Sequence, residues 1–168
     1  MENKIWTRDF VLNSLICFIA NLSYYMTMVI ITDYMVEKIG VSLSEAGFAC
    51  GVFILGALFA RLFIGQSIEV VGMKKALYLG MILFISTALN FVTYSLWSIS
   101  FVRFVQGIGF GIALTLTGAI MAPQIVPSSR RGEGTSYYAM FVTTATAIGP
   151  FAGIYFYQAG DLTINLII

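Results

Sequence analysis

The chain has 168 residues, of which 59% are hydrophobic and 10% are charged, and its formal net charge is +1. A soluble domain carries about 25% charged residues, so this composition predicts an integral membrane protein. The small net charge excludes nucleic-acid binding as an interpretation, and the absence of histidine removes the commonest metal ligand and acid–base catalyst. Cys17 and Cys50 both fall in apolar runs, and we interpret them as core side chains rather than a disulfide.

Charged residues divide the chain into long apolar runs. The first run, 10–32, lacks charges, and at about 1.5 Å per residue it is long enough to cross a hydrocarbon core of roughly 30 Å. It is also too long for the apolar part of a signal peptide and has no clear cleavage site. In chain order, we expect an all-α membrane protein with helices at 10–32, 46–66, 76–95, 98–123 and 134–160, and the start of a sixth at 162–168. Because that last segment is too short to span a membrane, we expect the chain to be part of a longer protein.

The basic residues indicate the orientation of these helices. Six of the nine lie on one side of the predicted membrane: Lys4, Arg8, Lys74, Lys75, Arg130 and Arg131. The loops of the opposite side hold Lys38. Because cytoplasmic loops are enriched in lysine and arginine, we expect a multi-pass protein of the cell membrane with a cytoplasmic N-terminus.

A glycine-rich charged segment lies between the second and third predicted helices. Gly65 and Gly72 permit a tight reversal of the chain, and Glu69 between them is placed to pair with a cation or to cap a helix. Lys74 and Lys75 would lie among lipid headgroups. An ordinary cytoplasmic turn is the alternative interpretation.

Arg103 is the most informative charge, because it falls inside the fourth predicted helix. An arginine within a span usually faces the protein interior or a water-filled cavity, although Arg103 is near enough to the helix end to snorkel to the interface instead. Gln106 and Gly107 follow it directly. Asp33, at the outer end of the first helix, is a candidate proton-coupling carboxylate or simply a solvated helix end.

The fifth predicted helix contains Gly149, Pro150 and Gly153. Proline removes a backbone hydrogen bond, so we expect a bend there, and the two glycines leave a flat surface beside it. Simple helix packing is the alternative, since glycine and proline are fairly common in membrane helices.

Together these residues resemble the N-terminal half of a major facilitator superfamily transporter. The resemblance rests on three motifs that occur in the expected order. The first is the loop between helices 2 and 3 (Gly65, Glu69, Gly72, Lys74, Lys75), where Glu69 replaces the usual aspartate. The second is a helix 4 motif (Arg103, Gln106, Gly107, Gly109), and the third is a helix 5 motif of antiporters (Gly149, Pro150, Gly153).

The resemblance implies an N-terminal six-helix bundle that works with a second bundle by alternating access. It implies that the Gly65 loop acts as a conformational switch and that Arg103 takes part in proton coupling. It also implies that helices 2 and 5 meet the missing C-terminal half through their glycine faces. The expected partners are a small-molecule substrate, the proton, the lipid bilayer and that second half.

The functional prediction is proton-coupled export of small amphipathic compounds or drugs, resembling a drug:proton antiporter. One alternative is export of a single specific metabolite, such as a metallophore or a sugar. Another is an inactive fragment or a membrane scaffold. An enzyme is not expected, because no nucleophile, acid–base pair or metal cluster is visible, and no cofactor or metal is expected either.

Overall fold

Five α-helices make up most of the part of the chain that the computed structural model describes, residues 4–85, 95–120 and 125–158. The side chains of 66–71 and 119–120 lie outside this description. The helices are α1 (Arg8–Tyr34), α2 (Leu43–Val71), α3 (Met73–Ile85), α4 (Leu96–Ile120) and α5 (Arg131–Gln158). Since the described residues contain no strand, the predicted all-α class is confirmed.

Four of these helices are long and apolar enough to cross a membrane, and they identify a multi-pass membrane protein. The spans are Arg8–Ile39, Leu43–Gly65, Leu96–Gly118 and Ser128–Gln158. Of the predicted third helix, α3 covers the part up to Ile85, and 86–94 lie outside the described residues. The predicted start of a sixth helix, 162–168, also lies outside them.

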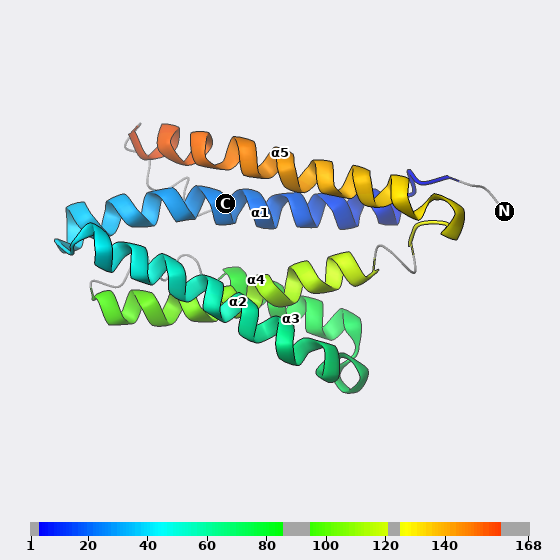
Figure 1. Cartoon of the computed structure of the whole chain (residues 1–168), viewed down its shortest axis with the longest axis horizontal. Coiled ribbons are helices and arrows are strands. Elements are labelled where there is room, and N and C mark those ends of the chain that lie inside the picture. Colours follow the sequence, from blue (N-terminus) through cyan, green and yellow to red (C-terminus); the bar gives the residue numbers. More distant parts are fainter. Residues whose placement is uncertain (1–3, 86–94, 121–124, 159–168) are drawn as a thin grey trace.

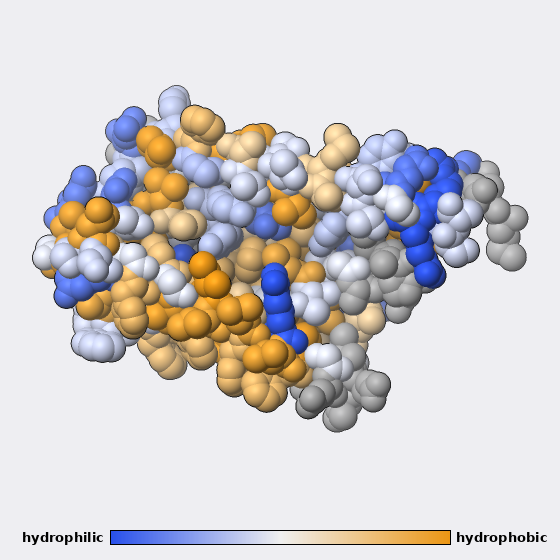
Figure 2. Space-filling view, in the orientation of Figure 1, coloured by the Kyte–Doolittle hydropathy of each residue, from blue (hydrophilic) through white to orange (hydrophobic). Residues whose placement is uncertain are grey.

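The helices pack in two layers, which Figure 1 shows edge-on. One layer is the pair α1 and α5, and the other contains α2, α3 and α4, with α4 packed on both of its neighbours. Hydrophobic side chains cover much of the outer side of the second layer (Figure 2). Large apolar side chains of α2, such as Leu55 and Leu62, are mostly exposed. Such a surface is typical of a protein that faces lipid rather than water.

Local sequence signals explain where the first span begins and ends and where the second begins. Thr7 caps α1 by accepting a hydrogen bond from the Phe10 amide at 3.2 Å. After α1 a short π-helix, Met35–Ile39, ends at Gly40, whose φ of 76° is left-handed. Ser42 and Glu45 then form a reciprocal capping box at the start of α2, with Glu45 Oε2 accepting from the Ser42 amide at 2.8 Å.

The turn between α2 and α3 is shorter than the sequence predicted. Gly65 lies within α2, which continues to Val71, and Gly72 alone separates the two helices with a φ of 83°. The reversal therefore depends on one left-handed glycine rather than on a loop from Gly65 onward. The predicted loop was too long because a polar stretch at a membrane surface can remain helical in water.

Candidate functional site

Glycines bring α4 unusually close to α2. A Cβ atom added at Gly107 would collide with the carbonyl oxygen of Phe53, and one added at Gly111 would lie 2.5 Å from the carbonyl oxygen of Ala57. Gly56 makes the reverse contact, since its added Cβ would collide with the backbone of Phe104. Small residues of this kind allow two membrane helices to pack backbone against backbone.

This close packing encloses Arg103 of α4. Its side chain is 1% exposed and is the largest fully buried one among the described residues. Arg103 lies seven residues after the start of α4, inside the span Leu96–Gly118. The structure therefore places the guanidinium in the protein interior and not at the interface, where the snorkelling interpretation would have put it.

The polar contacts of Arg103 are few. Nη1 donates to Gln106 Oε1 at 3.4 Å, and the guanidinium carbon lies 4.6 Å from the centre of the Phe53 ring, a cation–π contact. Nε and Nη2 are buried and have no hydrogen-bond partner within the part of the chain that the structure describes. A buried cation is costly unless its hydrogen-bond donors are satisfied. The Arg103 guanidinium is therefore a candidate to bind an acceptor that lies outside the described residues.

Aromatic side chains from α1 and α4 pack around the Phe53 ring that Arg103 contacts. The Tyr24 ring of α1 stacks on Phe53 at 4.6 Å between centroids and lies 5.0 Å from Phe110 of α4. Phe53 and Phe110 are 5.4 Å apart. Aromatic pairs at these separations attract one another beyond simple burial. Through Phe53, the arginine therefore lies against an apolar cluster at the junction of the two helical layers.

A second polar cluster joins the two layers through uncharged groups. Asn13 of α1 donates to the Thr117 carbonyl of α4 at 3.0 Å, and the Thr117 hydroxyl lies 3.0 Å from the Tyr138 hydroxyl of α5. Within α1, Asn21 donates to the Cys17 carbonyl at 2.8 Å. Hydrogen bonds of this kind hold membrane helices together, so the cluster fixes α1, α4 and α5 relative to one another.

Gly149 and Gly153 contact α1 and not a surface left open for another half of the protein. A Cβ added at Gly149 would lie 2.6 Å from Cβ of Tyr25, and one added at Gly153 would lie 2.9 Å from the carbonyl oxygen of Met26. The α-helix α5 continues through Pro150 without interruption. The expected contact of these glycines with the missing half is therefore wrong, because α1 already occupies their face.

The structure does not bring the other predicted residues to Arg103. Asp33 is exposed near the end of α1, and it forms no ion pair with the buried arginine. Nearby, the Tyr157 hydroxyl of α5 donates to Glu37 Oε2 at 2.6 Å. Lys74 and Lys75 are exposed at the start of α3, and the side chain of Glu69 lies outside the described residues.

The prediction from sequence omits some residues of this site. Phe53 and Asn13 received no role, although both are in direct contact with the predicted helix 4. Asparagine in an apolar run is a usable signal, because an amide in a membrane span must find a partner. Phe53 gave no such signal, since phenylalanine is common in every apolar segment of this chain.

Comparison with known proteins identifies the family of this chain. The model of the Major Facilitator Superfamily matches residues 14–167, which include the three motifs, most of α1 and all of α2 to α5. The chain belongs to the Major Facilitator Superfamily. No solved structure matches it significantly.

Two curated proteins are similar to this chain. The "Staphylopine export protein" of Staphylococcus aureus is 30% identical over 138 residues, covering 79% of this chain and 33% of the relative. The "Putative metabolite transport protein YyaJ" of Bacillus subtilis is 29% identical over 126 residues, covering 74% of this chain and 28% of the relative. The chain thus spans about a third of the length of these relatives.

Proposed function

We propose that this chain forms the N-terminal bundle of a secondary active transporter that exports small amphipathic compounds in exchange for protons. The observation that carries the proposal is the buried Arg103, whose Nε and Nη2 groups make no hydrogen bond to the described residues. Superfamily membership and the printed names of both relatives support a role in transport.

In this proposal Arg103 acts as a fixed positive charge. Arginine does not lose its proton in proteins, so it cannot carry the coupled proton itself. A buried cation instead favours the ionised form of a nearby acid, and it thereby sets how readily that acid takes up a proton. The acid would come from the substrate or from a part of the protein beyond the described residues.

The remaining predictions complete the proposal. The N-terminus lies in the cytoplasm of a cell-membrane protein, as the distribution of basic residues indicates. A second, C-terminal bundle faces this one across a central cavity, and the two move against each other in alternating access. The turn at Gly72, with Lys74 and Lys75 exposed beside it, acts as a conformational switch.

The test is export of ethidium, a fluorescent amphipathic cation, by the full-length protein in proteoliposomes with an imposed pH gradient. Arg103→Ala is expected to abolish gradient-driven export. Arg61→Ala is the matched control, because Arg61 is also an arginine in a predicted span but is exposed on α2. Full export by Arg103→Ala would show that the coupling role is wrong.

Export of one specific metabolite is the second candidate, and the name of the Staphylococcus aureus relative favours it. The same vesicles loaded with staphylopine test it directly. Gradient-driven release of staphylopine without release of ethidium would favour the specific exporter. Failure of the full-length protein to move either compound would favour the membrane scaffold.

A further inference from the structure

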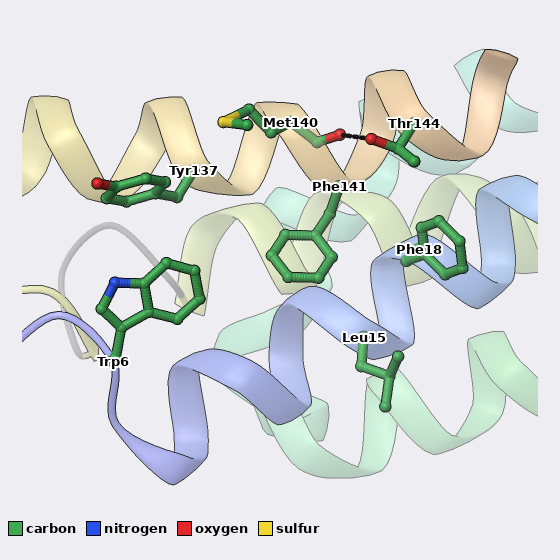
Figure 3. A pocket seen from close by; sticks show the side chains of 7 residues that line it. All are labelled: Trp6, Leu15, Phe18, Tyr137, Met140, Phe141 and Thr144. Carbon is green, nitrogen blue, oxygen red and sulfur yellow. Dashed lines mark hydrogen bonds between the residues drawn. The ribbon is translucent and has the colours of Figure 1, made fainter.

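A cavity of about 360 Å³ lies between α1 and α5, close to the end at which both helices begin (Figure 3). Seven side chains line it: Trp6, Leu15, Phe18, Tyr137, Met140, Phe141 and Thr144. Figure 3 shows that they come from both helices and from the segment before α1. We call this cavity the α1–α5 groove. Its volume is at the lower end of the range found for small-molecule sites.

The lining of the groove is apolar and carries no charge. Four of its residues are aromatic, and the Thr144 hydroxyl already donates to the Met140 carbonyl at 2.8 Å. Trp6 is 57% exposed and lies 5.0 Å from Tyr137 between ring centroids. Tryptophan and tyrosine gather at the headgroup level of membranes, so this pair marks the mouth of the groove at the interface. Such a lining favours a hydrocarbon chain as the occupant.

Positive charge collects at the same end of the helix pair. Arg8 is exposed and lies seven residues before Leu15, which is two helical turns along the same face of α1, about 10 Å away. Arg131 is exposed at the start of α5. Figure 2 shows hydrophilic side chains gathered at this end. The N-termini of α1 and α5 also lie here, and their helix dipoles add to the positive potential.

Acidic groups at this end offset only part of this charge. The described residues near it include four basic side chains, Lys4, Arg8, Arg130 and Arg131, and two acidic ones, Asp9 and Glu133. Glu133 is held by Arg130, with Oε1 accepting from Nη2 at 2.6 Å. This end of α1 and α5 therefore keeps a net positive charge, which can bind an anion beside the mouth of the groove.

We propose that the α1–α5 groove binds one anionic phospholipid, with an acyl chain in the groove and the phosphate between Arg8 and Arg131. The positive charge of Arg8 and Arg131 favours an anionic headgroup, and the uncharged lining of the groove favours an acyl chain. Basic pockets between membrane helices bind anionic headgroups for the same reason. This lipid site goes beyond the transport function proposed above, because it does not depend on substrate or on proton coupling.

Native mass spectrometry of the full-length protein, purified in equal amounts of phosphatidylglycerol and phosphatidylcholine, tests the site. The wild type is expected to retain phosphatidylglycerol preferentially. The double variant Arg8→Gln/Arg131→Gln should lower that preference by about fivefold for each arginine removed. The matched control Lys74→Gln/Lys75→Gln removes two exposed charges from the same predicted side of the membrane and should retain the preference.

A second pair of variants tests the groove itself. Met140→Trp fills the groove from an exposed position and should reduce retention of both lipids, whereas Ile54→Trp on α2 should not. Glycerol phosphate, which has the headgroup anion without a chain, should not compete. An unchanged preference in the arginine double variant would overturn the proposal. So would competition by glycerol phosphate, or crosslinking of Met140→Cys to another segment of the protein.

Discussion

The close contact between α2 and α4 makes a quantitative prediction at Gly111. A Cβ added there lies 2.5 Å from the Ala57 carbonyl oxygen and 2.9 Å from the Ala57 Cα, where ordinary contact begins at 3.4 Å. Both contacts are to backbone, so no side-chain rotation relieves them. Gly111→Ala therefore requires the two helices to separate by about an ångström, and such a gap forfeits a quarter to a half of each packing contact. The expected loss of unfolding free energy is about 1–3 kcal/mol.

The matched control is Gly118→Ala, on the same helix two turns later. No heavy atom lies within 4 Å of a Cβ added at Gly118. Both variants gain the same helix propensity, about 0.5–1 kcal/mol in favour of alanine, so the difference between them isolates the clash. Denaturant unfolding of the full-length protein in detergent micelles measures it. Equal stability of the two variants would refute the backbone contact between α2 and α4.

Three further predictions concern contacts between helices, each measured by the same unfolding assay. Thr117→Val and Tyr138→Phe should show a coupling energy of about 0.6 kcal/mol in a double-mutant cycle, because both remove the same hydrogen bond. Strictly additive losses of stability would contradict that hydrogen bond. Tyr157→Phe should cost less than about 1 kcal/mol, since its partner Glu37 is exposed, and a larger loss would indicate a buried pair. Gly153→Ala should destabilise by about 1–3 kcal/mol, because its Cβ would press on the α1 backbone, and a neutral result would argue against that packing.

The membrane class of the protein and the interior position of Arg103 could be predicted from the sequence. The helices that the glycines contact could not. Long apolar runs and the rarity of charge are sufficient to predict membrane helices, because the hydrocarbon core excludes unpaired charge. Which helix a glycine faces depends on packing, and no local pattern reports it. Gly153 was therefore assigned to a contact with the missing half, whereas it packs on α1.

The same limit applies to the surroundings of Arg103. Its position inside a span pointed to the protein interior on energetic grounds alone. The Phe53 ring that it contacts lies 50 residues earlier in the chain, and only the crossing of α2 and α4 brings the two together. The turn at Gly72 is shorter than predicted for a different reason. Helix ends fray, and weak local interactions decide at which residue they stop.

The role of Arg103 in coupling is the central claim, and one comparison of two transport modes tests it most directly. Proteoliposomes containing the full-length protein are measured for gradient-driven export and for counterflow exchange of ethidium in the absence of a pH gradient. If Arg103 acts on proton coupling, Arg103→Gln should lose gradient-driven export and retain counterflow. Loss of both modes together would instead place Arg103 in substrate binding or folding, and retention of both would contradict the claim.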